Sequence, residues 1–329
     1  MTERTGPNRR RRAVPGWRRR CCAAALAAAA VTCVLLLSVD TASAQVRATY
    51  LYSLSDFQGR LPYDWARVYV DEDREETYVI FGNIVRVFNA SAMEVFDFGD
   101  DLNLGQLLDV AVDPGGEIIL LSYKDSRSIV TRCNFRGEPL GQVEIKNLPA
   151  ELPFSANRMI YRNGLFYFAT LGAASVIITD EKGVFRERIE FLKLLEVEDQ
   201  KKTGVEMIGF TVDRQGNIFF TMPVLFKVFK YAPDRTLTSF GSPGSIPGKF
   251  GILAGIAADS RGNLHVLDKL KSAVQVFDKD FNFVTAFGYR GARPENLIVP
   301  DSLAIDGRDR LYVTQGRRRG VSVFALAYE

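Results

Sequence analysis

Residues 255–268 read GIAADSRGNLHVLD, two short apolar segments joined by a polar turn. The glycine of this turn takes the positive φ that a tight hairpin needs, so the stretch predicts a β-hairpin. A third segment, AVQVFD at 273–278, and a fourth, FNFVTAF at 281–287, follow before Gly288. Four short strands within about 45 residues are typical of one blade of a β-propeller.

The same hairpin pattern recurs along the chain. Each copy has an apolar strand, an aspartate, a turn and a second strand, and the aspartates are Asp71, Asp113, Asp213, Asp259 and Asp306. Their separations are 42, 100, 46 and 47 residues, and a degenerate copy with Arg162 in place of the aspartate divides the interval of 100. The sequence therefore predicts an all-β fold, a six-bladed β-propeller with four-stranded antiparallel blades that start near residues 65, 107, 157, 207, 254 and 301.

The two ends of the repeat region complement each other. The last copy ends with a third strand at 321–326, and the sequence ends at Glu329. At the other end, residues 49–54 form a strand-like segment that has no hairpin partner. Since a propeller closes its ring to avoid open sheet edges, we expect the N-terminal strand to join the C-terminal blade as its fourth strand.

The first 44 residues have the features of a secretory signal peptide. Eight arginines lie within residues 1–20, an apolar segment occupies 23–39, and Ala42-Ser43-Ala44 resembles a cleavage site before Gln45. We predict a Sec-type signal peptide at 1–44, a propeller at 45–329, and a secreted or periplasmic bacterial protein. Twin-arginine export stays open, as does an uncleaved membrane anchor, since a spanning helix needs roughly 20 apolar residues.

Removal of residues 1–44 changes the charge balance. The whole chain has 42 basic and 39 acidic residues, whereas residues 45–329 have 34 and 37, which is a net charge of about −3. The basic excess therefore belongs to the N-terminal segment and indicates neither a nucleic acid nor a membrane as partner. Of four cysteines only Cys133 remains, in an alternating strand, and we expect a partly buried thiol without an intrachain disulfide.

One connection departs from the repeat, at residues 190–207. Its apolar residues have roughly helical spacing and precede a charged run at 196–202. We expect a helical turn between the third and fourth blades, followed by a solvated surface or a partner site.

Residues 255–264 and 274–278 resemble an NHL repeat, as do 213–218 and 300–313. The resemblance covers the chain after residue 44 and is strong from about Phe210 onward. It implies a six-bladed propeller and, usually, a non-catalytic surface that binds proteins, nucleic acids or glycans. Some relatives are enzymes, so the fold alone leaves the activity open.

The repeated residues themselves are expected to be structural. An aspartate before a hairpin turn accepts backbone N–H groups, and the five aspartates lie on different blades, so they do not share an ion. His265, the only histidine, lies in the middle of a predicted strand and is expected to pack in the blade. One imidazole does not form the histidine-based zinc site of amidating lyases that share this fold.

A calcium-dependent hydrolase or lyase, similar to the gluconolactonases, is the alternative function. Such an enzyme needs carboxylate and amide oxygens that point into the central channel. Four candidates precede the first strands of their blades: Asp109, Asn157, Glu206 and Asp301. Outside this alternative no cofactor is expected, because the sequence contains no nucleophile set and no phosphate-binding glycine loop.

Surface recognition is the function that the sequence favours. Loops between second and third strands share one face with the connections between blades, and seven of their residues are cationic: Lys124, Arg127, Lys269, Lys271, Arg317, Arg318 and Arg319. The equivalent loop of the fourth blade is apolar and includes Met222, Leu225 and Phe226, which indicates either a protein contact or a buried strand. We therefore predict a monomeric, non-catalytic binding scaffold for a protein or an anionic envelope glycan. No nucleic acid is expected, and membrane contact only if residues 1–44 are retained.

Overall fold

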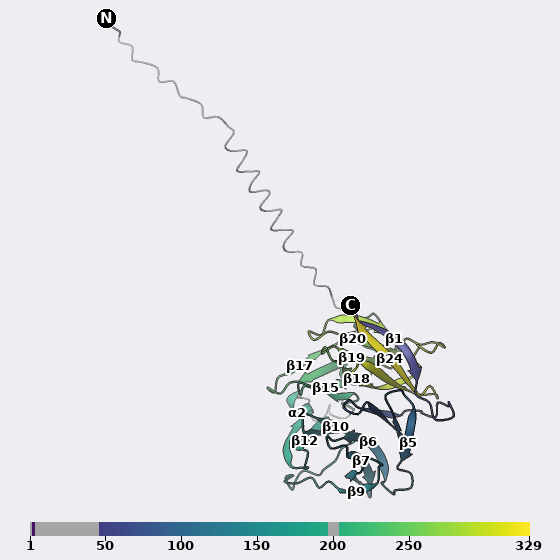
Figure 1. Ribbon diagram of the computed structural model, residues 1–329. Coiled ribbons are helices and arrows are strands. Elements are labelled where there is room, and N and C mark those ends of the chain that lie inside the picture. The colour runs from purple at the N-terminus through teal and green to yellow at the C-terminus, as the bar shows by residue number, and fades with distance from the viewer. Residues whose placement is uncertain (1, 4–45, 197–203) are drawn as a thin grey trace. The chain divides into compact units, whose positions relative to one another are not determined.

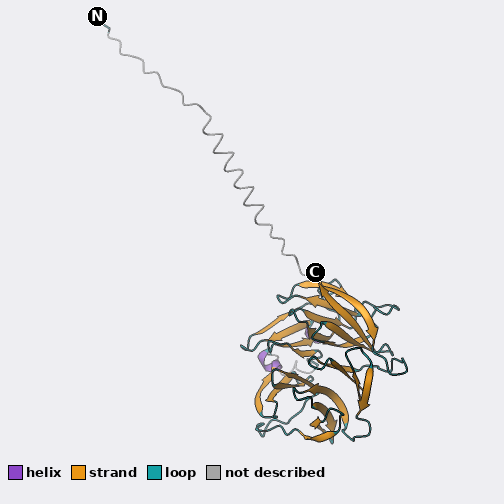
Figure 2. Cartoon of the chain, viewed as in Figure 1, coloured by secondary structure: helices purple, strands orange, loops and turns teal. Residues whose placement is uncertain are grey.

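The computed structural model describes residues 2–3, 46–196 and 204–329. The chain divides into residues 1–43 and a unit of residues 44–329. The signal-peptide prediction therefore lies almost entirely outside the described residues. Over its described residues, the unit of 44–329 contains six sheets of four antiparallel strands, and Figure 2 shows that strands and loops make up nearly all of it.

The strands of the first three blades, in chain order, are β2 (Arg67–Asp71), β3 (Glu76–Phe81), β4 (Ile84–Phe88) and β5 (Glu94–Phe98); β6 (Gln106–Val112), β7 (Ile118–Lys124), β8 (Arg127–Cys133) and β9 (Pro139–Gln142); β10 (Arg158–Arg162), β11 (Leu165–Thr170), β12 (Ser175–Asp180) and β13 (Phe185–Glu190). Those of the last three blades are β14 (Phe210–Val212), β15 (Ile218–Met222), β16 (Lys227–Tyr231) and β17 (Leu237–Phe240); β18 (Leu253–Ala258), β19 (Leu264–Asp268), β20 (Ala273–Phe277) and β21 (Phe283–Phe287); β22 (Pro300–Ile305), β23 (Arg310–Gln315), β24 (Val321–Tyr328) and β1 (Val46–Ser53).

The sixth blade joins the two ends of the propeller. β1 pairs antiparallel with β24, from Val46 opposite Tyr328 to Ser53 opposite Ser322. In Figure 1 the purple β1 accordingly lies beside the yellow β24. The predicted ring closure is confirmed, and the outer edge of β24 is covered by its own chain.

The repeated aspartates fix the turns between first and second strands. The Asp259 carboxylate accepts the backbone N–H groups of Arg261 at 3.0 Å and Asn263 at 2.8 Å. Asp306 accepts those of Arg308 and Arg310 in the same way, at 2.9 Å and 2.8 Å. These bonds satisfy turn donors that no strand partner reaches. The structural role predicted for the aspartates is confirmed.

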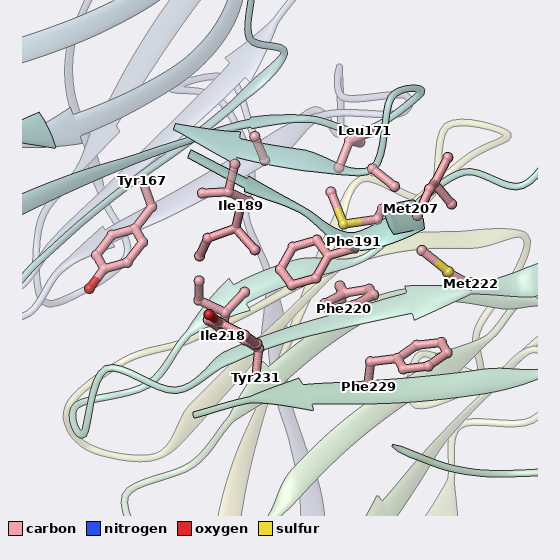
Figure 3. Close-up of a cluster of buried hydrophobic side chains, with 14 of the residues drawn as sticks. Tyr167, Leu171, Ile189, Phe191, Met207, Ile218, Phe220, Met222, Phe229 and Tyr231 are labelled. Atoms are coloured by element: carbon pink, nitrogen blue, oxygen red, sulfur yellow. The ribbon is translucent and has the colours of Figure 1, made fainter. Parts of the chain in front are cut away.

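Apolar side chains pack between neighbouring blades, as Figure 3 shows for blades three and four. The rings of Phe191 and Phe220 lie 4.2 Å apart between their centroids, and those of Phe220 and Phe229 lie 5.0 Å apart. Phe191 begins α2 (Phe191–Leu194), the short helix between these blades, so the predicted helical turn is confirmed. Most of the charged run that follows it, at 197–202, lies outside the described residues.

The two faces of the ring carry different loops. The first strand of every blade starts at the face that also carries the turns between second and third strands, which we call the upper face. The turns with the repeated aspartates lie on the opposite, lower face. Among the described residues, no helix has the length and apolar character needed to cross a membrane.

Candidate functional site

The first strands of the six blades surround a cavity of about 670 Å³ along the axis of the propeller. Its lower end holds Glu72, whose carboxylate lies 3.4 Å from Nη1 of Arg162 and 2.7 Å from Nη2 of Arg214. Glu72 belongs to blade one, and the arginines belong to blades three and four. These ion pairs therefore reach across the axis and narrow the lower opening, so we take the upper end as the mouth for a ligand.

One repeated sequence position supplies side chains to the upper end of the cavity. It lies four residues before the repeat aspartate, or before Arg162 in blade three, and is occupied in blade order by Arg67, Asp109, Arg158, Gly209, Gly255 and Ser302. The first three blades thus place long charged side chains here, and the last three place small residues. All six line the cavity.

Packing explains the small residues. A Cβ atom at Gly209 would lie 2.3 Å from the carbonyl oxygen of Ala254, and one at Gly255 would lie 2.8 Å from the nitrogen of Leu303. The first strands of blades four, five and six therefore approach each other directly, and glycine is required for this contact. In blades one to three the same position carries Arg67, Asp109 and Arg158, and all three line the cavity.

Asp109 lies in the gap between blades two and three. One carboxylate oxygen accepts the Met159 N–H at 2.9 Å, and the other accepts the Val110 N–H at 3.1 Å. Burial raises the pKa of Asp109 to about 6, although these hydrogen bonds and the charge of Arg67 favour the ionised form. Asp109 is thus a titrating carboxylate near neutral pH in the wall of the channel.

Arg67 is the cation of this group that lacks a partner. No hydrogen bond and no ion pair within 4.0 Å links its guanidinium to another residue that the structure describes. Burial lowers the pKa of Arg67, and the more distant charges of Asp109 and Asp301 oppose this effect. On the other side of Asp109, Nη1 of Arg158 donates to the Asn157 carbonyl at 2.8 Å. Two guanidinium groups therefore have donors left for a ligand.

A polar pair faces them from blades five and six. The Lys269 ammonium lies 2.6 Å from the Asp301 carboxylate and 5.0 Å from the centre of the Trp65 ring. Trp65 is 47% exposed and has a φ of 59°, which is strained for a bulky side chain. Trp65 does not itself line the cavity, but its exposed ring lies against Lys269, which does.

The four residues predicted to bind calcium do not form a ligand set. The Asn157 side-chain oxygen accepts the Leu171 N–H at 3.0 Å, Glu206 is exposed, and Asp301 is paired with Lys269. Among residues 46–196 and 204–329, no three His, Cys, Asp or Glu side chains are grouped as metal ligands. The charge of Arg67 beside Asp109 and Asp301 also disfavours a cation.

Four of the seven predicted binding cations make contacts within the protein. Lys124 donates to the Asn103 carbonyl at 2.8 Å, Lys271 to the Lys249 carbonyl at 2.7 Å, and Arg319 to the Arg293 carbonyl at 2.8 Å; Lys269 pairs with Asp301. The exposed members are Arg127, Arg317 and Arg318. Contacts within the protein thus fix four of the seven side chains, and the binding role of this face stays a prediction.

The apolar loop of blade four is only partly exposed. Of the two alternatives for this loop, a protein contact is wrong for Met222 and a buried strand is correct: β15 extends to Met222, whose side chain is buried between blades three and four. Leu225 is 37% exposed, while Phe226 packs against the core between blades four and five. Leu225 thus stays a candidate contact residue.

His265 and Cys133 are both buried in the interior of the propeller. His265 is fully buried, with Nε2 3.1 Å from Asp259, and Tyr312 makes the same contact with Asp306 six residues away, at 3.2 Å. The expected packing role of His265 is confirmed. Cys133 is also fully buried, and burial raises the pKa of its thiol to about 11.

The sequence analysis included Asp109 and Asp301 but missed Trp65, Arg67 and Arg158. An alignment of the six copies on the repeat aspartate would have found both arginines, because charged residues occupy one repeated position only in blades one to three. Trp65 carried no such signal, since its exposure depends on the contact with blade six. There its backbone N–H donates to the Gln315 carbonyl at 3.2 Å.

No known protein family and no curated protein matches the chain, so the NHL likeness stays a resemblance. Solved structures with a similar fold include a streptogramin B lyase, at 10% identity and a TM-score of 0.56 over 86% of this chain and 98% of the lyase. A gluconolactonase from Xanthomonas campestris has 14% identity and a TM-score of 0.58, over 88% of this chain and 93% of the gluconolactonase. An auxiliary nutrient binding protein from Bacteroides ovatus has 15% identity and a TM-score of 0.58, over 86% of this chain and 77% of the binding protein. The chain is thus a six-bladed β-propeller, the class of protein that its fold defines, and these likenesses concern the fold alone.

Proposed function

We propose that this protein is a secreted or periplasmic, non-catalytic binding propeller that takes an anionic group at the upper end of its central channel. The observation that supports this function is the guanidinium of Arg67, which has no partner among the described residues and lies beside a cavity of about 670 Å³. A cavity of this size is in the range of small-ligand sites. Arg67 is partly buried, and a guanidinium that is shielded from water gains from a partner that supplies hydrogen bonds.

The charge balance of the mouth favours a monoanion. At the upper end, Arg67, Arg158 and Lys269 oppose Asp109 and Asp301, which leaves one net positive charge when both carboxylates are ionised. The other carboxylates of the cavity lining belong to the turns of the lower face. A carboxylate fits this excess and accepts two parallel hydrogen bonds from a guanidinium. The partner is either a free small acid or the acidic end of an envelope glycan or protein. The exposed Arg127, Arg317 and Arg318 would attract such a partner toward the mouth.

The solved neighbours include a nutrient-binding protein as well as enzymes, so the proposal depends on the residues of the channel. A calcium-dependent hydrolase or lyase has weak support, because the four predicted ligands are engaged, exposed or placed beside Arg67. Metal analysis of the purified propeller tests this alternative directly. A stoichiometric divalent ion that is lost in Asp301→Asn would favour the enzyme.

Calorimetric titration of the protein with acetate, benzoate and chloride tests the anion site. We expect the carboxylates to bind and chloride to bind at least tenfold more weakly. Arg67→Gln should abolish carboxylate binding, because glutamine keeps polar donors but no charge. The matched control is Arg290→Gln, an exposed arginine in the connection between blades five and six on the same face. Equal affinity of the wild type and Arg67→Gln for every anion would refute the proposed site.

A further inference from the structure

The stretch that leads into the first blade combines an apolar surface with the anion receptor. Trp65 and Arg67 are two residues apart, and Ala66 between them is buried. The indole is fixed from blade six, where a Cβ atom at Gly316 would lie 2.6 Å from Cζ2 of the ring. The ring nevertheless stays half-exposed and its backbone stays in the left-handed region. The exposed part of the indole thus offers an apolar surface beside Lys269 and Asp301 on which a ligand ring can pack.

The polar groups beside Trp65 describe the rest of the ligand. Lys269 retains donors beyond its bond to Asp301, and Asp301 retains acceptor positions. A hydrocarbon ring over this pair would remove water from both groups without replacing its hydrogen bonds, which is costly. A ring with hydroxyl groups would replace them, because each hydroxyl both donates and accepts.

The net charge at the upper end of the channel limits the charge that the anionic group of the ligand can carry. One net positive charge suits a monocarboxylate, whereas a phosphate dianion would also meet the carboxylates of Asp109 and Asp301. Arg67 and Arg158 flank Asp109 on neighbouring blades. A carboxylate between the two guanidinium groups would give Arg67 a partner, which residues 46–196 and 204–329 do not supply.

We propose that the ligand is a hydroxylated cyclic monocarboxylate, the chemistry of a hexuronic acid, with its ring against Trp65, its hydroxyl groups on Lys269 and Asp301, and its carboxylate on Arg67. This inference rests on the proposed anion-binding function and adds the class of ligand. A free hexuronic acid and the terminal residue of an acidic polysaccharide share this chemistry.

Calorimetric titration with a graded set of compounds tests the inference. Glucuronate has the ring, the hydroxyl groups and the carboxylate; glucose lacks the carboxylate, cyclohexanecarboxylate lacks the hydroxyl groups, and acetate lacks the ring. We expect glucuronate to bind at least tenfold more tightly than each of the other three. A trigalacturonate that binds more tightly than galacturonate would identify a polysaccharide end as the source, and the reverse order would identify the free acid.

Two aromatic variants separate the contribution of Trp65 from general effects. Trp65→Ala should weaken glucuronate at least tenfold and leave acetate unchanged. The matched control is Tyr289→Ala, since Tyr289 is also half-exposed with a positive φ in an upper-face connection. It should change neither ligand. If Trp65→Ala fails to fold, the ligand class is tested with Trp65→Phe and with the order of affinities of the four compounds for the wild type.

The outcomes distinguish the two proposals. Glucuronate no tighter than acetate would overturn the ligand class and leave the anion site intact. Acetate and glucuronate both failing to bind would overturn the anion site as well. Glucuronate binding that Trp65→Ala and Trp65→Phe leave unchanged would place the ligand away from the residues named here.

Discussion

Asp109→Asn should change the pH dependence of stability more than stability itself. The pKa of Asp109 is about 6 in the folded protein, against an ordinary value near 3.8. The folded state therefore holds this proton more tightly than the unfolded state, so ionisation of Asp109 opposes folding. Wild-type stability is favoured at low pH, and this contribution is lost as the pH rises from near 4 toward the folded pKa of about 6.

The magnitude follows from the two pKa values. Between about pH 4.5 and about pH 7.5, ionisation of Asp109 lowers the free energy of unfolding by about 2 kcal/mol. Asparagine has a similar shape, accepts one of the two backbone N–H bonds and does not titrate. The difference in stability between Asp109→Asn and the wild type should therefore shift by about 2 kcal/mol in favour of the variant over this range.

Urea unfolding followed by tryptophan fluorescence, at both pH values, measures this shift. The matched control is Asp125→Asn, because Asp125 is an exposed carboxylate in a turn of the upper face. Its stability should follow that of the wild type within about 0.5 kcal/mol. Parallel stabilities of Asp109→Asn and the wild type at the two pH values would refute the assignment of a raised pKa to Asp109.

Three further perturbations test other parts of the structure. Cys133 should react with a thiol reagent only on unfolding, since burial and a pKa of about 11 leave about one thiolate in a thousand at pH 8; fast reaction of the folded protein would contradict this. Gly209→Ala should lower the free energy of unfolding by about 2 kcal/mol, because the added Cβ would lie 2.3 Å from a backbone oxygen. Gly172→Ala is the control, since the space around Gly172 is open, and it should change the stability little. Thermal melts of both variants measure the difference. Glu72→Gln should cost less than about 1 kcal/mol, and less at high salt, because its ion pairs are partly exposed; a salt-independent loss would contradict that.

The features that repeat could be predicted from the sequence. Six copies of a strand, an aspartate and a turn specify the blades, because each copy repeats the same local chemistry. The ring closure followed from an unmatched strand at the N-terminal end and a blade with only three strands at the C-terminal end. Exposure could not be predicted in the same way. Met222 lies in a segment that looks like an apolar loop, and whether it faces solvent depends on where β15 ends and on the neighbouring blade. Lys124 and Arg319 looked free because their carbonyl partners, at Asn103 and Arg293, lie on other segments of the chain.

The candidate site lies where the copies differ. Residues that all blades need, such as the repeat aspartates, recur because every turn has the same unsatisfied N–H groups. The position four residues before them has no such common requirement, since neighbouring first strands can touch directly, as at Gly209 and Gly255, or be separated by a side chain. A charged side chain in such a gap is costly to bury and is not needed for closure of the ring. Arg67 bears this cost without a partner in the described chain, which is the reason for assigning it to a ligand rather than to the fold.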